Sequence, residues 1–224
     1  MSAPRLVIFD VDGTISDSQG HILAAMADAF AAVDQPVPPR ETVLGIVGLS
    51  LDHAMPKLAP DLAPEDHQRM ADGYRAGYSR RMAAGGAALV PLYPGIREVI
   101  EELAADPDTR LAIATGKSLR GLIGLLDAHG LRDHFVSLQV ADHHPSKPHP
   151  SMLLTALAET GIAADRAVMI GDTSFDMDMA RAAGIAGIAV GWGYHPAREL
   201  GAAHAHVRAT TELPAAIERV LAGT

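Results

Sequence analysis

The sequence contains no cysteine and few aromatic residues, which make up 4% of its 224 residues and include one tryptophan. The lack of cysteine excludes disulfide bonds, thiolate metal sites and a cysteine nucleophile. Although 48% of the residues are hydrophobic, no run approaches the roughly 20 uncharged apolar residues that span a bilayer. The sequence therefore predicts a chain that folds in water, without a membrane partner.

Positive charge is also scarce, and the formal net charge is -9 at pH 7. The phosphate backbone of a nucleic acid would be repelled, so no nucleic acid polymer is expected as a partner. A small anionic substrate would need cations placed locally. Residues 1–5 lead directly into a strand-like run without a basic leader, which favours a cytoplasmic location. Composition leaves a monomer and a homodimer equally open.

Short apolar runs alternate with helical patterns along most of the chain. The runs end in turn or polar residues, as buried parallel strands do, and lie at residues 5–10, 110–115, 167–172 and 185–190, with a further run at 135–140. The helical patterns lie at residues 94–105, 118–129, 150–161 and 176–183. This alternation predicts an α/β fold with a Rossmann-like, doubly wound parallel sheet.

Residues 18–86 interrupt this rhythm, because they offer amphipathic helices and no convincing strand. Ile22, Met26, Phe30 and Val33 share one helix face, and a second long helical pattern covers residues 64–82. The prediction is an all-helical module of residues 17–87, inserted into an α/β core of residues 1–16 and 88–224.

Polar residues gather where the predicted strands end. Ligands bind at the carboxyl edge of such sheets, and this edge is expected to collect Asp10, Asp12, Thr115, Gly116, Lys147, Asp172 and Asp176. Four converging carboxylates would repel one another and raise each other's pKa values, so a cation is needed among them. Oxygen ligands without cysteine or a well-spaced histidine pair fit Mg²⁺ best.

Four short motifs give the sequence a specific resemblance. They are DVDGT at residues 10–14, ATG at 114–116, KP at 147–148 and GDTSFD at 171–176. In type and order they resemble the four motifs of the haloacid dehalogenase superfamily. The helical insertion after the first motif is similar to the cap of its phosphoglycolate-phosphatase-like branch. The resemblance covers nearly the whole chain and implies a phosphoric monoester hydrolase that acts on small organic phosphates.

The resemblance also implies catalytic roles. Asp10 would be the nucleophile and carry a transient aspartyl phosphate. Asp12 would protonate the leaving oxygen and then activate water, which requires a raised pKa, and crowding by other carboxylates offers a reason for one. Lys147 would neutralise developing charge and keep Asp10 ionised.

Binding roles follow in the same way. Thr115 and the Gly116 amide would bind a phosphate oxygen, together with Lys147. Mg²⁺ would be held by Asp10, the backbone carbonyl of Asp12 and Asp172, with Asp176 as a further or more distant ligand. The loop Gly48-Leu49-Ser50 is the candidate substrate-facing segment, and residues 13–18 and 85–94 are the predicted hinges of cap closure.

Other functions remain open on the sequence alone. A haloacid dehalogenase would lack the acid at the position of Asp12, which favours phosphoryl transfer. A phosphomutase of hexose phosphates has similar core motifs. A phospho-accepting regulatory module uses comparable residues, but its phosphorylated aspartate ends a middle strand and it needs no lid. Lys117 is either a surface charge or a substrate neighbour, and the surface charge is favoured. The segment Trp192–His195 carries no assignment.

Overall fold

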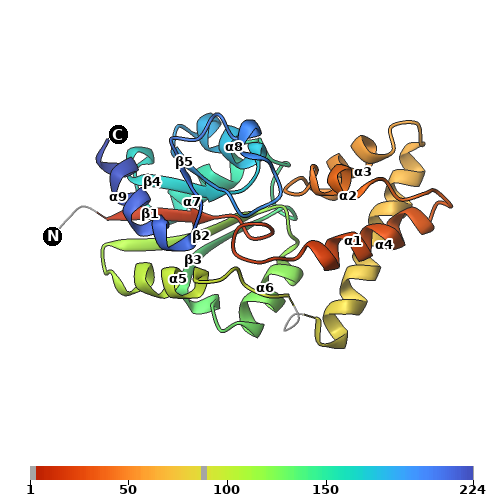
Figure 1. The fold of residues 1–224 in the computed structure, drawn as a ribbon, viewed down its shortest axis with the longest axis horizontal. Coiled ribbons are helices and arrows are strands. Elements are labelled where there is room, and N and C mark those ends of the chain that lie inside the picture. Colours follow the sequence, from red (N-terminus) through yellow and green to blue (C-terminus); the bar gives the residue numbers. More distant parts are fainter. Residues whose placement is uncertain (1–3, 87–89, 224) are drawn as a thin grey trace.

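The computed structural model describes residues 4–86 and 90–223 and has a six-stranded sheet at its centre (Figure 1). All neighbouring strands pair in parallel, in the order β3-β2-β1-β4-β5-β6. The strands are β1 (Arg5–Phe9), β2 (Thr109–Thr115), β3 (Phe135–Val140), β4 (Ala167–Gly171), β5 (Ala186–Val190) and β6 (Ala205–Val207). This confirms the predicted Rossmann-like α/β fold class.

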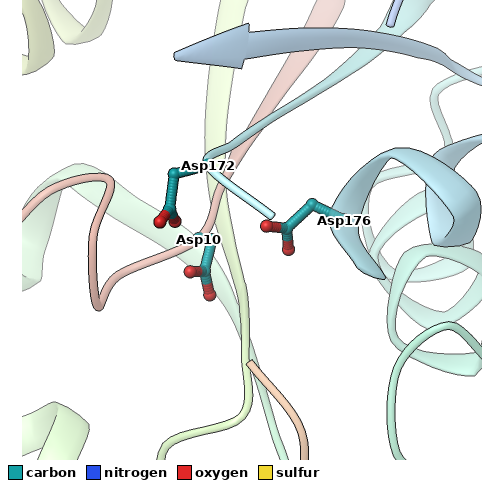
Figure 2. A group of neighbouring side chains, drawn as sticks. All are labelled: Asp10, Asp172 and Asp176. Atoms are coloured by element: carbon teal, nitrogen blue, oxygen red, sulfur yellow. The ribbon is translucent and has the colours of Figure 1, made fainter. Parts of the chain in front are cut away.

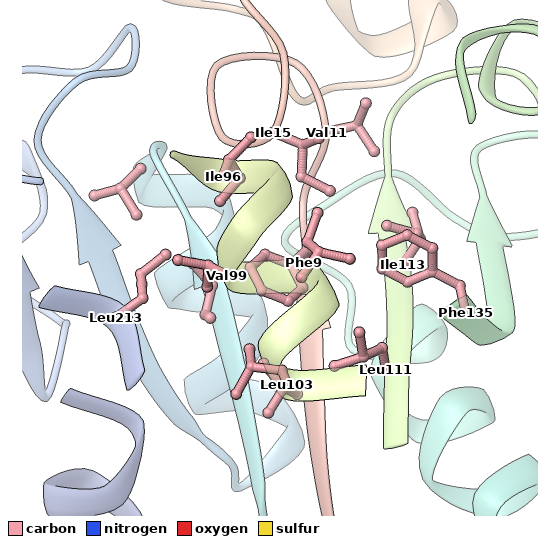
Figure 3. Close-up of a cluster of buried hydrophobic side chains, with 14 of the residues drawn as sticks. Phe9, Val11, Ile15, Ile96, Val99, Leu103, Leu111, Ile113, Phe135 and Leu213 are labelled. Atoms are coloured by element: carbon pink, nitrogen blue, oxygen red, sulfur yellow. The ribbon is translucent and has the colours of Figure 1, made fainter. Parts of the chain in front are cut away.

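Alternating side chains of the buried strands build a core on each face of the sheet. Leu6 and Ile8 of β1 join one cluster, beneath α7 (Ser151–Thr160) and α8 (Ser174–Ala183). Val7 and Phe9 join the other, beneath α5 (Ile96–Ala105), α6 (Leu119–Ala128) and α9 (Leu213–Ala222), part of which is drawn in Figure 3. The uninterrupted apolar run of β1 therefore follows from burial on both faces.

The inserted helices form a separate lobe at the end of the molecule opposite the termini (Figure 1). They are α1 (Gln19–Ala31), α2 (Arg40–Leu44), α3 (Leu51–Leu58) and α4 (Pro64–Arg81), followed by a kinked segment, Met82–Gly86, in which Gly85 has a positive φ. Ile22, Met26 and Phe30 of α1 are buried in this lobe's own apolar cluster, as the helical spacing predicts. The predicted boundary at residues 87 and 88 and part of the predicted hinge at 85–94 lie outside the described residues.

Predicted and observed elements agree within two residues wherever the pattern was long and apolar. Four short or terminal elements were not predicted, namely α2, α3, β6 and α9. Strand β6 has three residues and an exposed His206, so it lacks an apolar run to recognise. Among the described residues, none of the helices combines the length and the apolar character that crossing a bilayer requires.

Candidate active site

The candidate site lies where β1 and β4 run side by side in the middle of the sheet. Strands β2 and β3 lie to one side of this pair, and β5 and β6 to the other. Strand order therefore reverses between β1 and β4, and ligands of open α/β sheets bind at the carboxyl edge of such a point. Asp10 follows β1 directly and Asp172 follows β4 directly.

A tight turn after β1 brings polar groups against Asp172. Gly13 has φ of +90°, and a Cβ at this position would lie 2.2 Å from Asp172 Oδ2. Glycine is required here both for the backbone conformation and for the close approach. Thr14 Oγ1 donates to Asp172 Oδ1 over 3.0 Å, and the Tyr194 backbone N–H donates to Asp172 Oδ2 over 2.7 Å. The Asp172 carboxylate is therefore held from both sides.

Asp176 reaches the same place from the first turn of α8 (Figure 2). Its Oδ2 accepts the Thr173 backbone N–H over 3.0 Å and the Thr173 hydroxyl over 2.7 Å, within a capping box that begins the helix. Carboxylate oxygens of Asp10, Asp172 and Asp176 lie within 4.8 Å of one another. The structure thus brings together three of the four predicted carboxylates.

Lys147 supplies the positive charge inside this cluster. Its side chain is fully buried, and Nζ donates to Asp10 Oδ1 over 2.8 Å and to Asp176 Oδ1 over 2.6 Å. Burial alone lowers the pKa of the Lys147 ammonium, but the charges of Asp10 and Asp176 raise it above its ordinary value. Lys147 therefore stays protonated and faces the carboxylate of Asp10.

One ammonium does not compensate three buried carboxylates. Burial raises the pKa of Asp10 from 3.8 to about 7, with Asp176 adding to the rise and Lys147 opposing it. Burial, together with the charges of Asp10 and Asp176, also raises the pKa of Asp172 well above its ordinary value. Asp10 Oδ2 is buried and has no hydrogen-bond partner among the described residues. The cluster therefore retains uncompensated negative charge and an unused oxygen.

A hard divalent cation fits these residues. Carboxylate oxygens are the ligands that Mg²⁺ prefers, and a bound cation would offset the cost of burying the charges. Asp10 and Asp172 fit the role of direct ligands. Both oxygens of Asp172 accept hydrogen bonds from neutral groups only. Asp176 Oδ1 instead accepts from the Lys147 ammonium, whose positive charge would repel a cation, so Asp176 suits a supporting position.

Asp12 has different surroundings from those predicted. Its carboxylate is not part of the three-carboxylate cluster, so its nearest partners are not acidic side chains. Lys117 Nζ donates to both Asp12 oxygens at 2.9 Å, and the Ser18 hydroxyl donates to Oδ1. From the sequence, Asp12 is expected beside the other carboxylates because Asp10 and Asp12 both follow strand β1. The turn after β1 instead directs its side chain toward the inserted helices.

The interpretation of Lys117 as a surface charge is wrong. Its side chain is 5% exposed and lies between Asp12 and α4, where Nζ also donates to the Tyr78 hydroxyl over 2.8 Å. Burial alone lowers the pKa of Lys117, but Asp12 and Tyr78 raise it above its ordinary value. A sequence cannot show that an inserted helix covers this loop.

A cavity of about 360 Å³ lies between the sheet edge and the inserted helices. The core contributes Asp10, Asp12, Thr115, Gly116 and Lys117, and the inserted lobe contributes the predicted loop Gly48-Leu49-Ser50 together with Tyr74, Arg75 and Tyr78. A Cβ on Gly116 would lie 2.6 Å from the Gly48 carbonyl oxygen, so the two loops are in close contact. Two of the three predicted phosphate-binding residues, Thr115 and Gly116, therefore line the same cavity as the predicted substrate-facing loop, whereas Lys147 is not among its lining residues.

Several residues of this site were not predicted. Tyr78 lies on α4, and its spacing resembles that of any half-buried helix residue. Ser18 precedes α1, and its hydroxyl lies 3.2 Å from that of Tyr194. Tyr194 belongs to the segment Trp192–His195, to which the sequence assigns no role. The position of that segment after a strand end was the available signal, because such loops lie at the ligand-binding edge.

Comparison with known proteins agrees with this geometry. The family model described as haloacid dehalogenase-like hydrolase matches residues 7–190. A Dickeya dadantii protein named probable phosphatase IndB is 35% identical over 207 residues, which cover 90% of this chain and 87% of that protein. A Chromobacterium violaceum phosphoglycolate phosphatase is 34% identical over 206 residues, which cover 88% of this chain and 90% of that enzyme.

A solved structure from Clostridium acetobutylicum, described as that of a predicted phosphatase, aligns with a TM-score of 0.85 and 25% identity. The alignment covers 97% of this chain and 100% of the other. These matches confirm the predicted family and enzyme class, a phosphoric monoester hydrolase. The chain belongs to the haloacid dehalogenase-like hydrolases.

Proposed function

We propose that this protein is a Mg²⁺-dependent phosphatase that cleaves small organic phosphate monoesters through an aspartyl phosphate on Asp10. The observation that carries the proposal is the buried Asp10, Asp172 and Asp176 cluster with Lys147 as its ammonium. Asp10 lines the cavity, and its Oδ2 has no hydrogen-bond partner among the described residues. A nucleophile needs such an oxygen, free to attack phosphorus. When bound, Mg²⁺ supplies charge neutralisation for the carboxylates and the transferring phosphoryl group.

The reaction divides into two displacements at phosphorus. Asp10 attacks the substrate, its oxygen forms a bond to phosphorus, and the ester oxygen leaves with a proton from Asp12. Water with Asp12 as its base then cleaves the aspartyl phosphate and regenerates the Asp10 carboxylate. Lys147 stabilises charge on the carboxylate side of both steps. Thr115 and the Gly116 amide line the cavity where they can bind the phosphoryl oxygens.

Residues 17–87 act as a cap in this proposal, and residues 1–16 and 88–224 act as the catalytic core. The cap closes over the phosphoryl group and limits access of bulk water. The leaving group would lie in the cavity beside the cap loop Gly48-Leu49-Ser50 and helix α4. Phosphoglycolate-like substrates are the nearest candidates, since one relative bears that name and the cavity volume limits the size of the leaving group.

The test is phosphate release from a panel of phosphoglycolate, sugar phosphates and nucleoside monophosphates, with Mg²⁺ or with a chelator. Asp10→Asn serves as the catalytic blank. Asp178→Asn is the matched control, because Asp178 is a partly exposed aspartate on α8 that pairs with Arg181. Magnesium-dependent release by wild type and Asp178→Asn, but not by Asp10→Asn, is the expected result. Transfer of phosphate within a hexose phosphate without release would instead identify a mutase.

A further inference from the structure

Lys117 is a second buried lysine, separate from the Lys147 cluster. All three of its ammonium hydrogens have acceptors: Nζ lies 2.9 Å from each Asp12 oxygen and 2.8 Å from the Tyr78 hydroxyl. The ammonium also lies 4.7 Å from the centroid of the Tyr78 ring. Two of its three bonds thus hold one carboxylate in a single orientation.

These contacts connect Asp12 to the inserted helices. Tyr78 belongs to α4, and its ring stacks on Tyr74 with centroids 6.1 Å apart. Ser18, which donates to Asp12 from the other side, immediately precedes α1. Movement of the inserted lobe away from the core would therefore separate Lys117 from Tyr78 while leaving the core loop that carries Lys117 in place.

Charge compensation alone does not account for this arrangement. The Asp12 side chain is 13% exposed and that of Lys117 is 5% exposed, so each charge needs a partner, but a single contact would supply one. Two contacts from Nζ to the same carboxylate do more, because they also fix its orientation. Here both charges line the cavity, where a carboxylate is needed in one orientation to pass a proton. The bidentate contact fixes that orientation, and the Tyr78 hydroxyl fixes the lysine.

We propose that Lys117 and Tyr78 are positioning residues that hold the Asp12 carboxylate toward the leaving group when the cap contacts the core. The inference rests on the proposed phosphatase function and adds to it a route by which cap contact completes the acid and base position. This role requires neither residue to contact the phosphoryl group. Their effect is carried by Asp12.

If Lys117 and Tyr78 act through Asp12, the effect of changing them should depend on how basic the leaving group is. An alkoxide must receive a proton as the P–O bond breaks, whereas a nitrophenolate leaves as a stable anion. Loss of Asp12 positioning should therefore slow the first displacement for an alkyl phosphate and spare it for p-nitrophenyl phosphate. A defect in binding or folding would slow both.

The experiment measures the first turnover of both esters by rapid quench, with Mg²⁺ present, for wild type, Lys117→Met and Tyr78→Phe. For the alkyl phosphate, we expect the rate to fall on the order of 10²-fold in Lys117→Met. In Tyr78→Phe it should fall about fivefold to tenfold, which corresponds to one hydrogen bond. The nitrophenol burst should change less than about threefold in both variants.

Lys57→Met is the matched control. Lys57 Nζ lies 5.2 Å from the Phe175 ring centroid. It is therefore a cap ammonium that contacts the core, whereas Lys117 is a core ammonium that contacts the cap, and Lys57 lies apart from Asp12. We expect this variant to slow both esters equally or not at all. Tyr78→Phe keeps its ring and its stacking on Tyr74, so it tests the inference even where Lys117→Met folds poorly.

Two results would overturn the inference. Equal losses for both esters in Tyr78→Phe would assign the residue to binding or structure, and an unchanged alkyl phosphate rate in both variants would remove any positioning role. Failure of the proposed function is distinguishable, because wild type itself would then form no product from either ester, and both proposals would be abandoned.

Discussion

Asp10 and Asp12 are two residues apart in the sequence, yet their carboxylates lie in opposite electrostatic surroundings. Asp10 shares one lysine, Lys147, with Asp176, and Asp172 lies in the same cluster. Asp12 has Lys117 to itself, with both of its oxygens bound. The first group therefore has more negative than positive charge, and the second is balanced.

The difference separates two tasks at one sheet edge. The unbalanced cluster fits a cation and a nucleophile, because its excess charge favours Mg²⁺ and leaves an oxygen of Asp10 unpartnered. In the balanced pair, Lys117 holds both oxygens of Asp12, which suits a proton-transfer group that must keep one orientation. A variant that changes the charge of the three-carboxylate cluster should therefore alter magnesium binding without altering the Asp12–Lys117 pair, and the reverse should also hold.

The largest expected effect comes from Asp10→Asn. Removing the nucleophile should lower phosphate release by on the order of 10⁴-fold or more, as for nucleophiles of other covalent enzymes. Steady-state assays with the best substrate of the panel measure the loss, with Asp178→Asn as control. A reduction below about tenfold would contradict covalent catalysis at Asp10.

Lys147→Met should have the next largest effect, and on stability as well as on activity. It leaves Asp10, Asp172 and Asp176 without their buried ammonium, so the free energy of unfolding should fall by about 3 kcal/mol or more. Urea unfolding of the metal-free protein measures this change. Lys57→Met, which removes an ammonium outside the cluster, should change stability by less than about 1 kcal/mol.

Magnesium should stabilise the folded protein through the unbalanced cluster. At a concentration about 100 times its Kd, one bound ion adds about 2.7 kcal/mol to the free energy of unfolding. Thermal unfolding with and without Mg²⁺ measures the effect. We expect the shift in wild type and Asp12→Asn, and its near absence in Asp172→Asn. An equal shift in all three proteins would place the ion elsewhere.

A further expected effect, on stability alone, is a change in its pH dependence. Because the folded protein raises the pKa of Asp10 from 3.8 to about 7, the folded state binds more protons than the unfolded state in this interval, and stability falls as pH rises through it. Asp10→Asn removes this cost. Without metal, the variant should be more stable than wild type at pH 8 and lose this advantage below pH 4.

Urea unfolding at pH 4, 6 and 8 tests this sign directly. Asp178→Asn, with its partly exposed carboxylate, should follow wild type at every pH. An Asp10→Asn variant that is less stable than wild type at pH 8 would show that Lys147 stabilises the ionised carboxylate more than burial opposes it.

Much of the fold could be predicted from the sequence because its central strands are apolar throughout. Strand β1 ends within one residue of the prediction, and Gly184 ends α8 in the left-handed conformation, as its position predicted. The helices α2 and α3 have five and eight residues, too few for a helical period to repeat, and Pro56 lies inside α3. Local pattern carries little information on such elements.

The convergence of Asp10, Asp172 and Asp176 was predictable for a similar reason, since parallel strands bring their carboxyl ends to one edge. The partners of Asp12 were not predictable. Lys117 and Tyr78 meet only because an inserted helix packs over a core loop, and that contact depends on the placement of one lobe against another rather than on either local pattern.

Phosphate transfer to Asp10 can be observed by rapid acid quench of the enzyme during turnover, followed by mass spectrometry of its peptides. We expect one phosphoryl group on the peptide that contains Asp10, removable by hydroxylamine as an acyl phosphate is, and absent from Asp10→Asn. Phosphate on Asp172, Asp176 or a hydroxyl side chain, or active enzyme that never carries phosphate, would contradict transfer to Asp10.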